Sequence, residues 1–346
     1  MTSHRQSFVW TNIAATLAIG VFGASARADA LSDFYAGKTV TIFVGSAPGG
    51  TYDLYARTIG RHLGKYMPGQ PRVIVQNMPG AASYRAASHV FNVAPQDGTA
   101  IGALASALPY QTLIDPNAPE LDVPRINWLS SVSTFTVVLA VDKKLPIRNV
   151  DDLRGKQTIM ATLSPGQLPS LLVAATNETL GTKIKAINGH PSMNDALLAV
   201  QRGELDGYPG IPVDSLKRMA SQISSQLHVV LQYGPKASAD YPDAAYALDL
   251  VTKPDDRMLL DLAQAPLKIG YIYMTGPGVV PERVKAMREA LSETYKDKTF
   301  LAEAEKSILN IEPLEGEQLQ KIIQETFKTP RSVVERMHEL YRRSFR

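Results

Sequence analysis

Hydrophobic residues recur with two different periods along the early part of the chain. Residues 39–44 are apolar on both faces and rich in β-branched side chains, which is typical of a strand buried in a parallel sheet. From Tyr52 onward, apolar residues recur at helical spacing and basic residues form a separate stripe. Residues 72–76 again have the composition of a strand. The pattern predicts a strand–helix–strand unit of the type that builds doubly wound α/β sheets.

The same alternation continues through the rest of the chain. It predicts strands over residues 136–141 and 157–162 and helices over residues 170–180 and 195–202. Pro281 can occupy the first turn of a further helix, and the chain beyond it is predicted to be mainly helical.

No repeat and no linker rich in Gly, Pro or Ser separates two continuous domains. We therefore expect two lobes that exchange chain. Residues 29–130 and 267–346 would form one lobe, and residues 131–266 the other. A cleft between two such lobes is a natural place for a ligand and a hinge.

Residues 1–28 have the features of a secretory signal. A basic start precedes an apolar stretch, and Ala26 and Ala28 fit the small-residue pattern before a cleavage site. We expect the exported protein to begin at Asp29 and to reside in the periplasm. A retained membrane anchor is the alternative, but polar residues interrupt the apolar stretch.

Charge and cysteine content exclude several classes of function. The chain has 36 Lys and Arg against 33 Asp and Glu, and losing Arg5 and Arg27 with the signal lowers the net charge from +3 to +1. This balance argues against nucleic acid as a partner. The chain has no Cys, which excludes disulfides, thiolate metal sites and Cys nucleophiles.

The segment with the clearest chemistry follows the first predicted strand. Gly49 and Gly50 let the backbone approach a bound group, and Thr51 can cap a helix whose free N–H groups attract an anion. This arrangement predicts a carboxylate or phosphate pocket. The alternative is a tight turn with Asp53 favourably placed in the first helical turn.

Two other loops combine Pro, Gly and small residues directly after a predicted strand. One contains Pro79 and Gly80, and the other contains Ser164, Gly166 and Gln167. Each could be a turn alone, but their shared position at strand ends makes them candidate ligand loops.

Asp195 admits two interpretations. Ser192 and Asp195 have the spacing of a capping box, and both side chains could instead contact a solute at the cleft. The sequence lacks the G-x-S-x-G, H-E-x-x-H, Walker A and G-x-G-x-x-G motifs, which weakens every enzyme hypothesis.

Several short motifs, spread in order over most of the chain, resemble one known family. They read SAPGGTYDLYAR, QNMPGA, APQDGTAIG, LSPGQ, QRGELDG and GPGVVPERV, at residues 46–57, 76–81, 94–102, 163–167, 201–207 and 276–284. Each is weak alone, but together they are specific. The chain is similar to the receptors of tripartite tricarboxylate transporters, the Bug family of periplasmic binding proteins.

The resemblance implies a type II periplasmic binding protein fold, α/β in class, with two doubly wound lobes, a hinge and a central ligand cleft. It also implies no cofactor and delivery of an organic acid to membrane subunits. Tyr52 departs from the common loop, which is smaller there, and can close or reshape the pocket. By position, the resemblance places the ligand carboxylate between two loops, formed by Ser46, Ala47, Gly49, Gly50, Thr51 and Asp53 and by Ser164, Gly166 and Gln167.

We therefore predict a monomeric periplasmic receptor, not an enzyme, that closes on a small carboxylate and uses neither metal nor cofactor. One alternative is a cleft hydrolase or isomerase that uses Asp53, His190 or Asp195 on an organic acid. A soluble sensor that reports the same solute to a signalling protein is the other.

Overall fold

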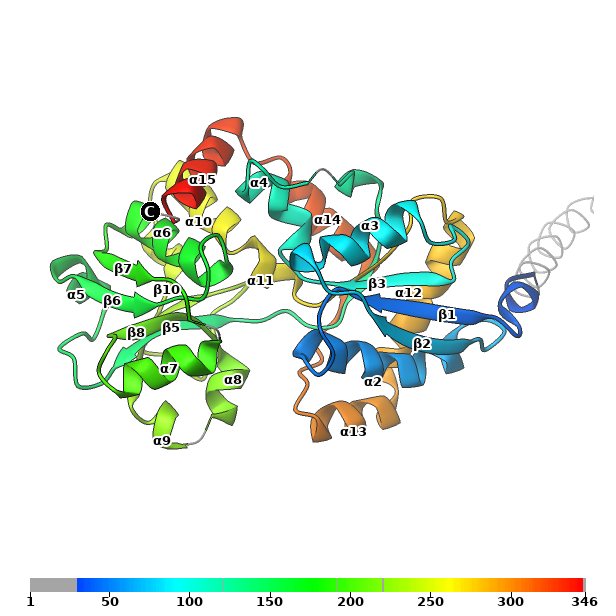
Figure 1. Ribbon diagram of the computed structural model, residues 1–346, viewed down its shortest axis with the longest axis horizontal. Coiled ribbons are helices and arrows are strands. Elements are labelled where there is room, and N and C mark those ends of the chain that lie inside the picture. Colours follow the sequence, from blue (N-terminus) through cyan, green and yellow to red (C-terminus); the bar gives the residue numbers. More distant parts are fainter. Residues whose placement is uncertain (1–29, 120, 191, 220, 345–346) are drawn as a thin grey trace, which may run out of the picture.

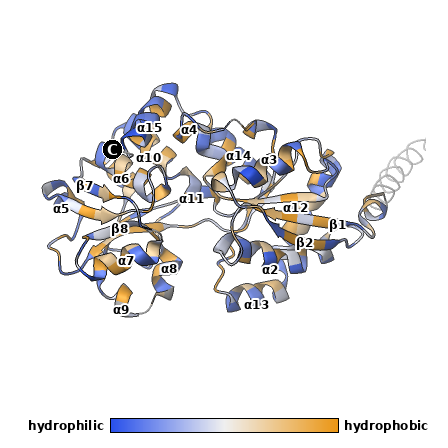
Figure 2. Cartoon of the chain, viewed as in Figure 1, coloured by the Kyte–Doolittle hydropathy of each residue, from blue (hydrophilic) through white to orange (hydrophobic). Residues whose placement is uncertain are grey.

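The computed structural model describes residues 30–344 except 120, 191 and 220, so the predicted signal segment lies outside the described residues. The chain forms two lobes that lie side by side, each built around one mixed β-sheet (Figure 1). Hydrophobic residues concentrate along the strands, and the outward faces of the helices are largely hydrophilic (Figure 2). Within the described ranges, no helix combines the length and apolar character needed to cross a bilayer.

The first sheet has the strand order β12-β4-β11-β3-β1-β2. Its strands β1, β2 and β3 are parallel, as the sequence predicts, whereas β11 runs antiparallel to β3 and β4. The strands are β1 (Thr39–Val44), β2 (Arg72–Asn77), β3 (Ala100–Leu104), β4 (Asn127–Ser131), β11 (Ile272–Thr275) and β12 (Leu314–Glu315).

Helices cover both faces of this sheet, which explains why β1 is apolar on both sides. Ile42 of β1 packs with side chains of α2 and α12, and Phe43 packs with side chains of α3. The helices of this lobe are α2 (Thr51–Tyr66), α3 (Tyr84–Asn92), α12 (Pro281–Lys296), α13 (Lys298–Lys306) and α14 (Gly316–Thr326).

The second sheet has the order β10-β9-β5-β8-β6-β7 and is also mixed, because β5 runs antiparallel to β8 and β9. Its strands are β5 (Val137–Asp142), β6 (Thr158–Ala161), β7 (Ile184–Ile187), β8 (Gly207–Pro212), β9 (Leu227–Tyr233) and β10 (Ala245–Tyr246). The helices around it are α5 (Val150–Gly155), α6 (Leu168–Leu180), α7 (Met193–Gln201), α8 (Val213–Arg218), α9 (Ser221–Ser224), α10 (Pro254–Ala263) and α11 (Ala265–Ile269).

The chain passes between the sheets twice, from β4 to β5 and from β10 to β11. The lobe boundaries proposed from the sequence lie at the end of β4, between residues 130 and 131, and within α11, between residues 266 and 267; they stay a prediction. The last helix, α15 (Arg331–Arg343), contacts α6 and α10 beside the second sheet and also the short helix α4 (Gln111–Ile114), which follows β3. The C-terminal helix therefore contacts both lobes, whereas the division expected from the sequence places it in the first lobe alone.

Candidate functional site

A cavity of about 550 Å³ lies between the lobes, on the side of α2 and α8. The first lobe contributes the start of α2 and the loop after α13, and the second contributes the starts of α7 and α8. Phe135 and Tyr271, which stand on the two passages between the sheets, complete the wall. Because both lobes and both passages bound this cavity, its size must change when the lobes move. We therefore take it as the candidate ligand site.

The first helix begins at the cavity without a side-chain cap. Gly49 has a φ of 83°, a left-handed conformation that glycine adopts readily. Gly50 is the N-cap in extended conformation and makes no side-chain hydrogen bond to the first turn. Thr51 is thus the first helical residue rather than the cap that the sequence predicted. The free N–H groups and the positive end of the helix dipole lie where an anion would be stabilised.

Asp53 fixes the shape of this loop from within. The residue is only 3% exposed. One carboxylate oxygen accepts from the Gly49 N–H at 2.8 Å and from Arg57 Nε at 3.0 Å, and the other accepts from Asn77 Nδ2 at 2.8 Å. Asn77 Nδ2 also donates to the Ser46 carbonyl at 3.1 Å. Asp53 therefore positions the loop, and direct contact between Asp53 and a ligand stays a prediction.

These contacts keep Asp53 ionised. Burial alone would raise the pKa of the carboxyl group, but the hydrogen bonds from Arg57, Gly49 and Asn77, together with the Arg57 charge, hold it below its usual value. Arg57 Nη2 also donates to Asn77 Oδ1 at 2.8 Å, so the guanidinium is committed to this network. These contacts hold the loop in this conformation without a ligand.

The loop with Pro79 and Gly80 is tied to its neighbours by a residue that the sequence analysis did not single out. Residues 81–83 have positive φ values of 44°, 48° and 77°, a strained left-handed turn for non-glycine residues. Ser83 is buried, and its hydroxyl donates to the Gly45 carbonyl at 3.1 Å and accepts from the Ala105 N–H at 3.0 Å. The ends of β1, β2 and β3 are thereby joined at one edge of the sheet.

The predicted second-lobe loop has a different partner. The Gly166 N–H donates to Ser344 Oγ at 3.1 Å, and a Cβ on Gly166 would lie 2.3 Å from the Tyr341 ring. Ser164 and Gln167 are exposed. None of the three predicted residues of this loop is among those that line the interlobe cavity, whereas Thr51 and Tyr52 are. Their part in ligand binding stays a prediction.

Asp195 is exposed and lies in the first turn of α7. Its N–H donates to Ser192 Oγ at 3.2 Å, and the Ser192 hydroxyl donates to Asp195 Oδ2 at 2.6 Å. Ser192 therefore caps the helix, as one of the two interpretations expects. Met193, beside this cap, lines the cavity, and Asp195 does not appear among the lining residues.

An aromatic cluster forms the wall between the lobes. The Tyr271 ring lies 4.8 Å from Tyr52, 4.3 Å from Tyr55 and 5.7 Å from Phe135, measured between ring centroids. The Tyr52 hydroxyl accepts from the Ser106 N–H at 3.4 Å. Burial raises the pKa of Tyr52, so its hydroxyl is neutral at physiological pH. The bulky Tyr52 noted in the sequence is part of this wall.

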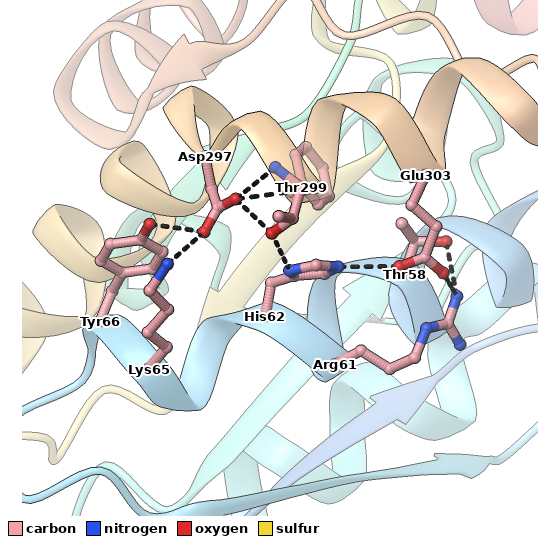
Figure 3. Close-up of polar contacts among 9 residues, drawn as sticks. Thr58, Arg61, His62, Lys65, Tyr66, Asp297, Thr299 and Glu303 are labelled. Carbon is pink, nitrogen blue, oxygen red and sulfur yellow. Dashed lines mark hydrogen bonds and ion pairs between the residues drawn. The ribbon is translucent and has the colours of Figure 1, made fainter.

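A polar seam joins α2 to α13 (Figure 3). Asp297 caps α13 and accepts from Lys65 Nζ at 2.7 Å and from the Tyr66 hydroxyl at 2.6 Å. Further along α13, Glu303 pairs with Arg61 and lies 2.8 Å from His62 Nε2. The loop that follows α13 lines the cavity, and its Asn310 carbonyl accepts from the Tyr55 hydroxyl at 2.9 Å. The seam therefore holds one rim of the site in place.

Over the described residues, no group of three or more His, Asp or Glu side chains is arranged to hold a metal ion.

No family model matches the sequence, and no curated protein matches it. Its structure has the architecture of periplasmic solute-binding proteins. It is similar to a TctC solute-binding protein from Polaromonas, with a TM-score of 0.68, 15% identity and coverage of 89% of this chain and 99% of that one. It is also similar to the periplasmic binding protein BugD, with a TM-score of 0.60, 16% identity and coverage of 90% of this chain and 98% of that one. A third similar structure is MatC from Rhodopseudomonas palustris with bound malate, with a TM-score of 0.60, 16% identity and coverage of 88% of this chain and 99% of that one.

At these identities the likeness establishes the fold. The predicted two-lobed α/β binding-protein fold is confirmed, and the structures that share it include the TctC and Bug proteins to which the sequence motifs pointed.

Proposed function

We propose that the protein is an extracytoplasmic receptor that captures a small carboxylate solute between its lobes and delivers it to a tripartite tricarboxylate-type transporter. The observation that carries this proposal is the interlobe cavity, which opens at the uncapped start of α2. A solute carboxylate there would accept from the free N–H groups of the first turn. The fold shared with a malate-bound protein supports the same ligand chemistry.

The lining of the cavity favours binding over catalysis. Among the lining residues, Asp214 is the one with a charged side chain, and His, Lys and Arg are not represented. General acid–base chemistry needs a donor and an acceptor within reach of the same substrate, and a single half-exposed carboxylate does not supply both. We therefore propose a receptor rather than a hydrolase or isomerase.

Contacts with both lobes would stabilise the closed form over the open form, and the membrane partner would read that change of shape. We propose a monomer that acts in the periplasm after removal of residues 1–28. Recovery of transporter subunits with the receptor, rather than a signalling kinase, would distinguish transport from sensing.

The test is a calorimetric and thermal-shift screen of the protein from Asp29 against mono-, di- and tricarboxylates. A ligand that binds the folded state raises its melting temperature. Gly50→Val should weaken any hit at least tenfold, because it places a side chain over the start of α2, while its Cβ meets only the Ala47 carbonyl at 3.7 Å.

Gly155→Val is the matched control, because a Cβ at Gly155, at the end of α5, meets nothing within 4 Å. The proposal is wrong if no carboxylate binds, if Gly155→Val weakens binding as much as Gly50→Val, or if the bound compound is consumed.

A further inference from the structure

The cavity has one electropositive end and one acidic wall. The electropositive end is the start of α2, a helix of 16 residues whose N-cap Gly50 has no side chain to bind the first free N–H groups and whose first-turn carboxylate, Asp53, is paired with Arg57. The opposite wall belongs to the second lobe and includes Asp214 and Ser215 at the start of α8. Asp214 is half-buried, so its charge is incompletely screened by water. One carboxylate of a solute is attracted at the α2 end, and a second one directed toward α8 would meet a like charge.

Two cations on helices that line the cavity, Arg57 of α2 and Lys217 of α8, are already paired. Arg57 is held by Asp53 and Asn77. Lys217 of α8 lies 2.6 Å from Asp240, and hydrogen bonding to that carboxylate together with the charges of Asp240 and Asp214 raises the pKa of the ammonium group. These cations are not available to a second solute carboxylate without breaking an existing pair.

Lys236 lines an adjoining cavity that also touches Asp214, and it is paired with Glu312. This third cation is thus also engaged by a carboxylate of the protein. A dicarboxylate would therefore bury one of its charges without a partner, which is unfavourable.

The space between the two ends is aromatic. Tyr52, Phe135 and Tyr271 are half-buried, so part of each ring faces the cavity that they line. Met193 of α7 lines the same cavity from the second lobe. Rings stack on or meet other rings edge-on with an added gain over simple burial, and the Met thioether also packs well against rings. This middle section suits a flat apolar body.

We propose that the cleft selects a monocarboxylate with an aromatic body and that Asp214 excludes a second carboxylate. In this arrangement the carboxylate lies at the start of α2, the ring lies between the aromatic wall and Met193, and the far end of the solute near Asp214 carries no negative charge. The inference rests on the proposed receptor function and names the solute class for the same site.

The experiment compares benzoate and 3-phenylpropionate with malate and adipate by calorimetry on the protein from Asp29. The expected result is at least tenfold tighter binding of one of the two aromatic acids than of either dicarboxylate. Asp214→Lys should raise the ratio of the affinity for adipate to the affinity for the aromatic acid at least tenfold. Asp214→Asn should raise the same affinity ratio by less.

Asp243→Asn is the matched control, because this exposed carboxylate of the second lobe is not among the cavity-lining residues, and the ratio should not change. Tighter binding of malate or adipate to the unsubstituted protein would overturn the inference and leave the receptor function standing. So would an unchanged ratio in both Asp214 variants, each checked for folding by circular dichroism. If none of the four acids nor any other carboxylate binds, the receptor function fails and the inference fails with it.

Discussion

The two walls of the cleft are built in different ways. On the first lobe, the loops after β1, β2 and β3 are fixed by buried polar contacts of Asp53, Asn77 and Ser83. On the second lobe, the cavity is lined by the starts of α7 and of the six-residue helix α8. The first wall presents the start of α2 with its backbone N–H groups beside Tyr52 and Tyr55, and the second presents Met193, Asp214 and Ser215.

This difference suggests that the two walls make different contributions to ligand binding. Backbone donors in a fixed loop can hold a carboxylate but distinguish little beyond it, whereas side chains on the facing lobe can select the rest of the solute. A preformed anion site also loses less binding free energy to its own ordering than a flexible site does. We therefore expect substitutions on the first wall to change affinity for all carboxylates, and substitutions on the second wall or between the walls to change selectivity.

The largest expected effect on binding is that of a substitution at Gly45, which directly follows β1 in the first wall. A Cβ there would lie 2.3 Å from Ser83 Oγ and 2.8 Å from Ser83 Cα, so Gly45→Ala must displace the strained turn. Overpacking of this kind costs about 1–3 kcal/mol of folding free energy. Denaturant unfolding should show this loss, and calorimetry should show more than tenfold weaker binding of every carboxylate. Gly155→Ala should change neither quantity, and a Gly45→Ala protein that binds normally would show that the turn does not shape the site.

Asp53→Asn should have the next largest effect. It removes the charge that accepts from Gly49, Arg57 and Asn77, and hydrogen bonds to a buried charged group contribute about 1.5–3 kcal/mol. We expect a loss of stability within that range and weaker binding without a change in preference among acids. A variant with native stability but altered preference would instead make Asp53 a direct ligand contact.

Lowering the pH should selectively remove the contribution of Asp53 to the stability of the folded protein. Its pKa is held below the ordinary value in the folded protein, so its stabilising effect is present above the unfolded-state pKa, about 3.9, and is lost as pH falls through the lower folded value. The difference in melting temperature between the parent protein and Asp53→Asn should therefore shrink below about pH 4. A difference that stays constant from pH 7 to pH 3 would contradict this account.

The smallest expected effect is at the aromatic wall. Phe135→Leu keeps an apolar side chain but removes a ring that lies 5.7 Å from Tyr271. Aromatic pairs add about 0.5–1.5 kcal/mol beyond burial, so binding of an aromatic acid should weaken by that amount while binding of adipate is nearly unchanged. Equal weakening of both ligands would assign Phe135 to the hinge rather than to selection.

Local sequence pattern was enough to predict the elements that begin the site. The apolar run of β1 and the stripe of α2 depend on neighbours in the chain, and Asp53 and Arg57 stand one helical turn apart. Asn77, the third member of their network, could not be inferred, because its partnership depends on how β2 lies beside β1.

The second wall was harder to predict for the same reason. Phe135, Asp214 and Tyr271 come from separate segments that only the three-dimensional fold brings together, and no motif marks them. The sequence does not predict the placement of α15, because the apolar face of this helix shows that it packs but does not identify its partner. The sequence predicts Thr51 as the cap of α2, whereas the structure has Gly50 at that position, since a backbone turn can start the helix without a side chain.

The central claim is that the lobes close around a carboxylate, and a distance between them tests it most directly. Leu198 of α7 and Leu301 of α13 are exposed on opposite lobes, and the absence of Cys from the chain allows spin labels at these two positions alone. Pulsed electron paramagnetic resonance on Leu198→Cys/Leu301→Cys should show a shorter distance when a carboxylate that binds in calorimetry is added. An unchanged distance distribution at saturating ligand would contradict the account.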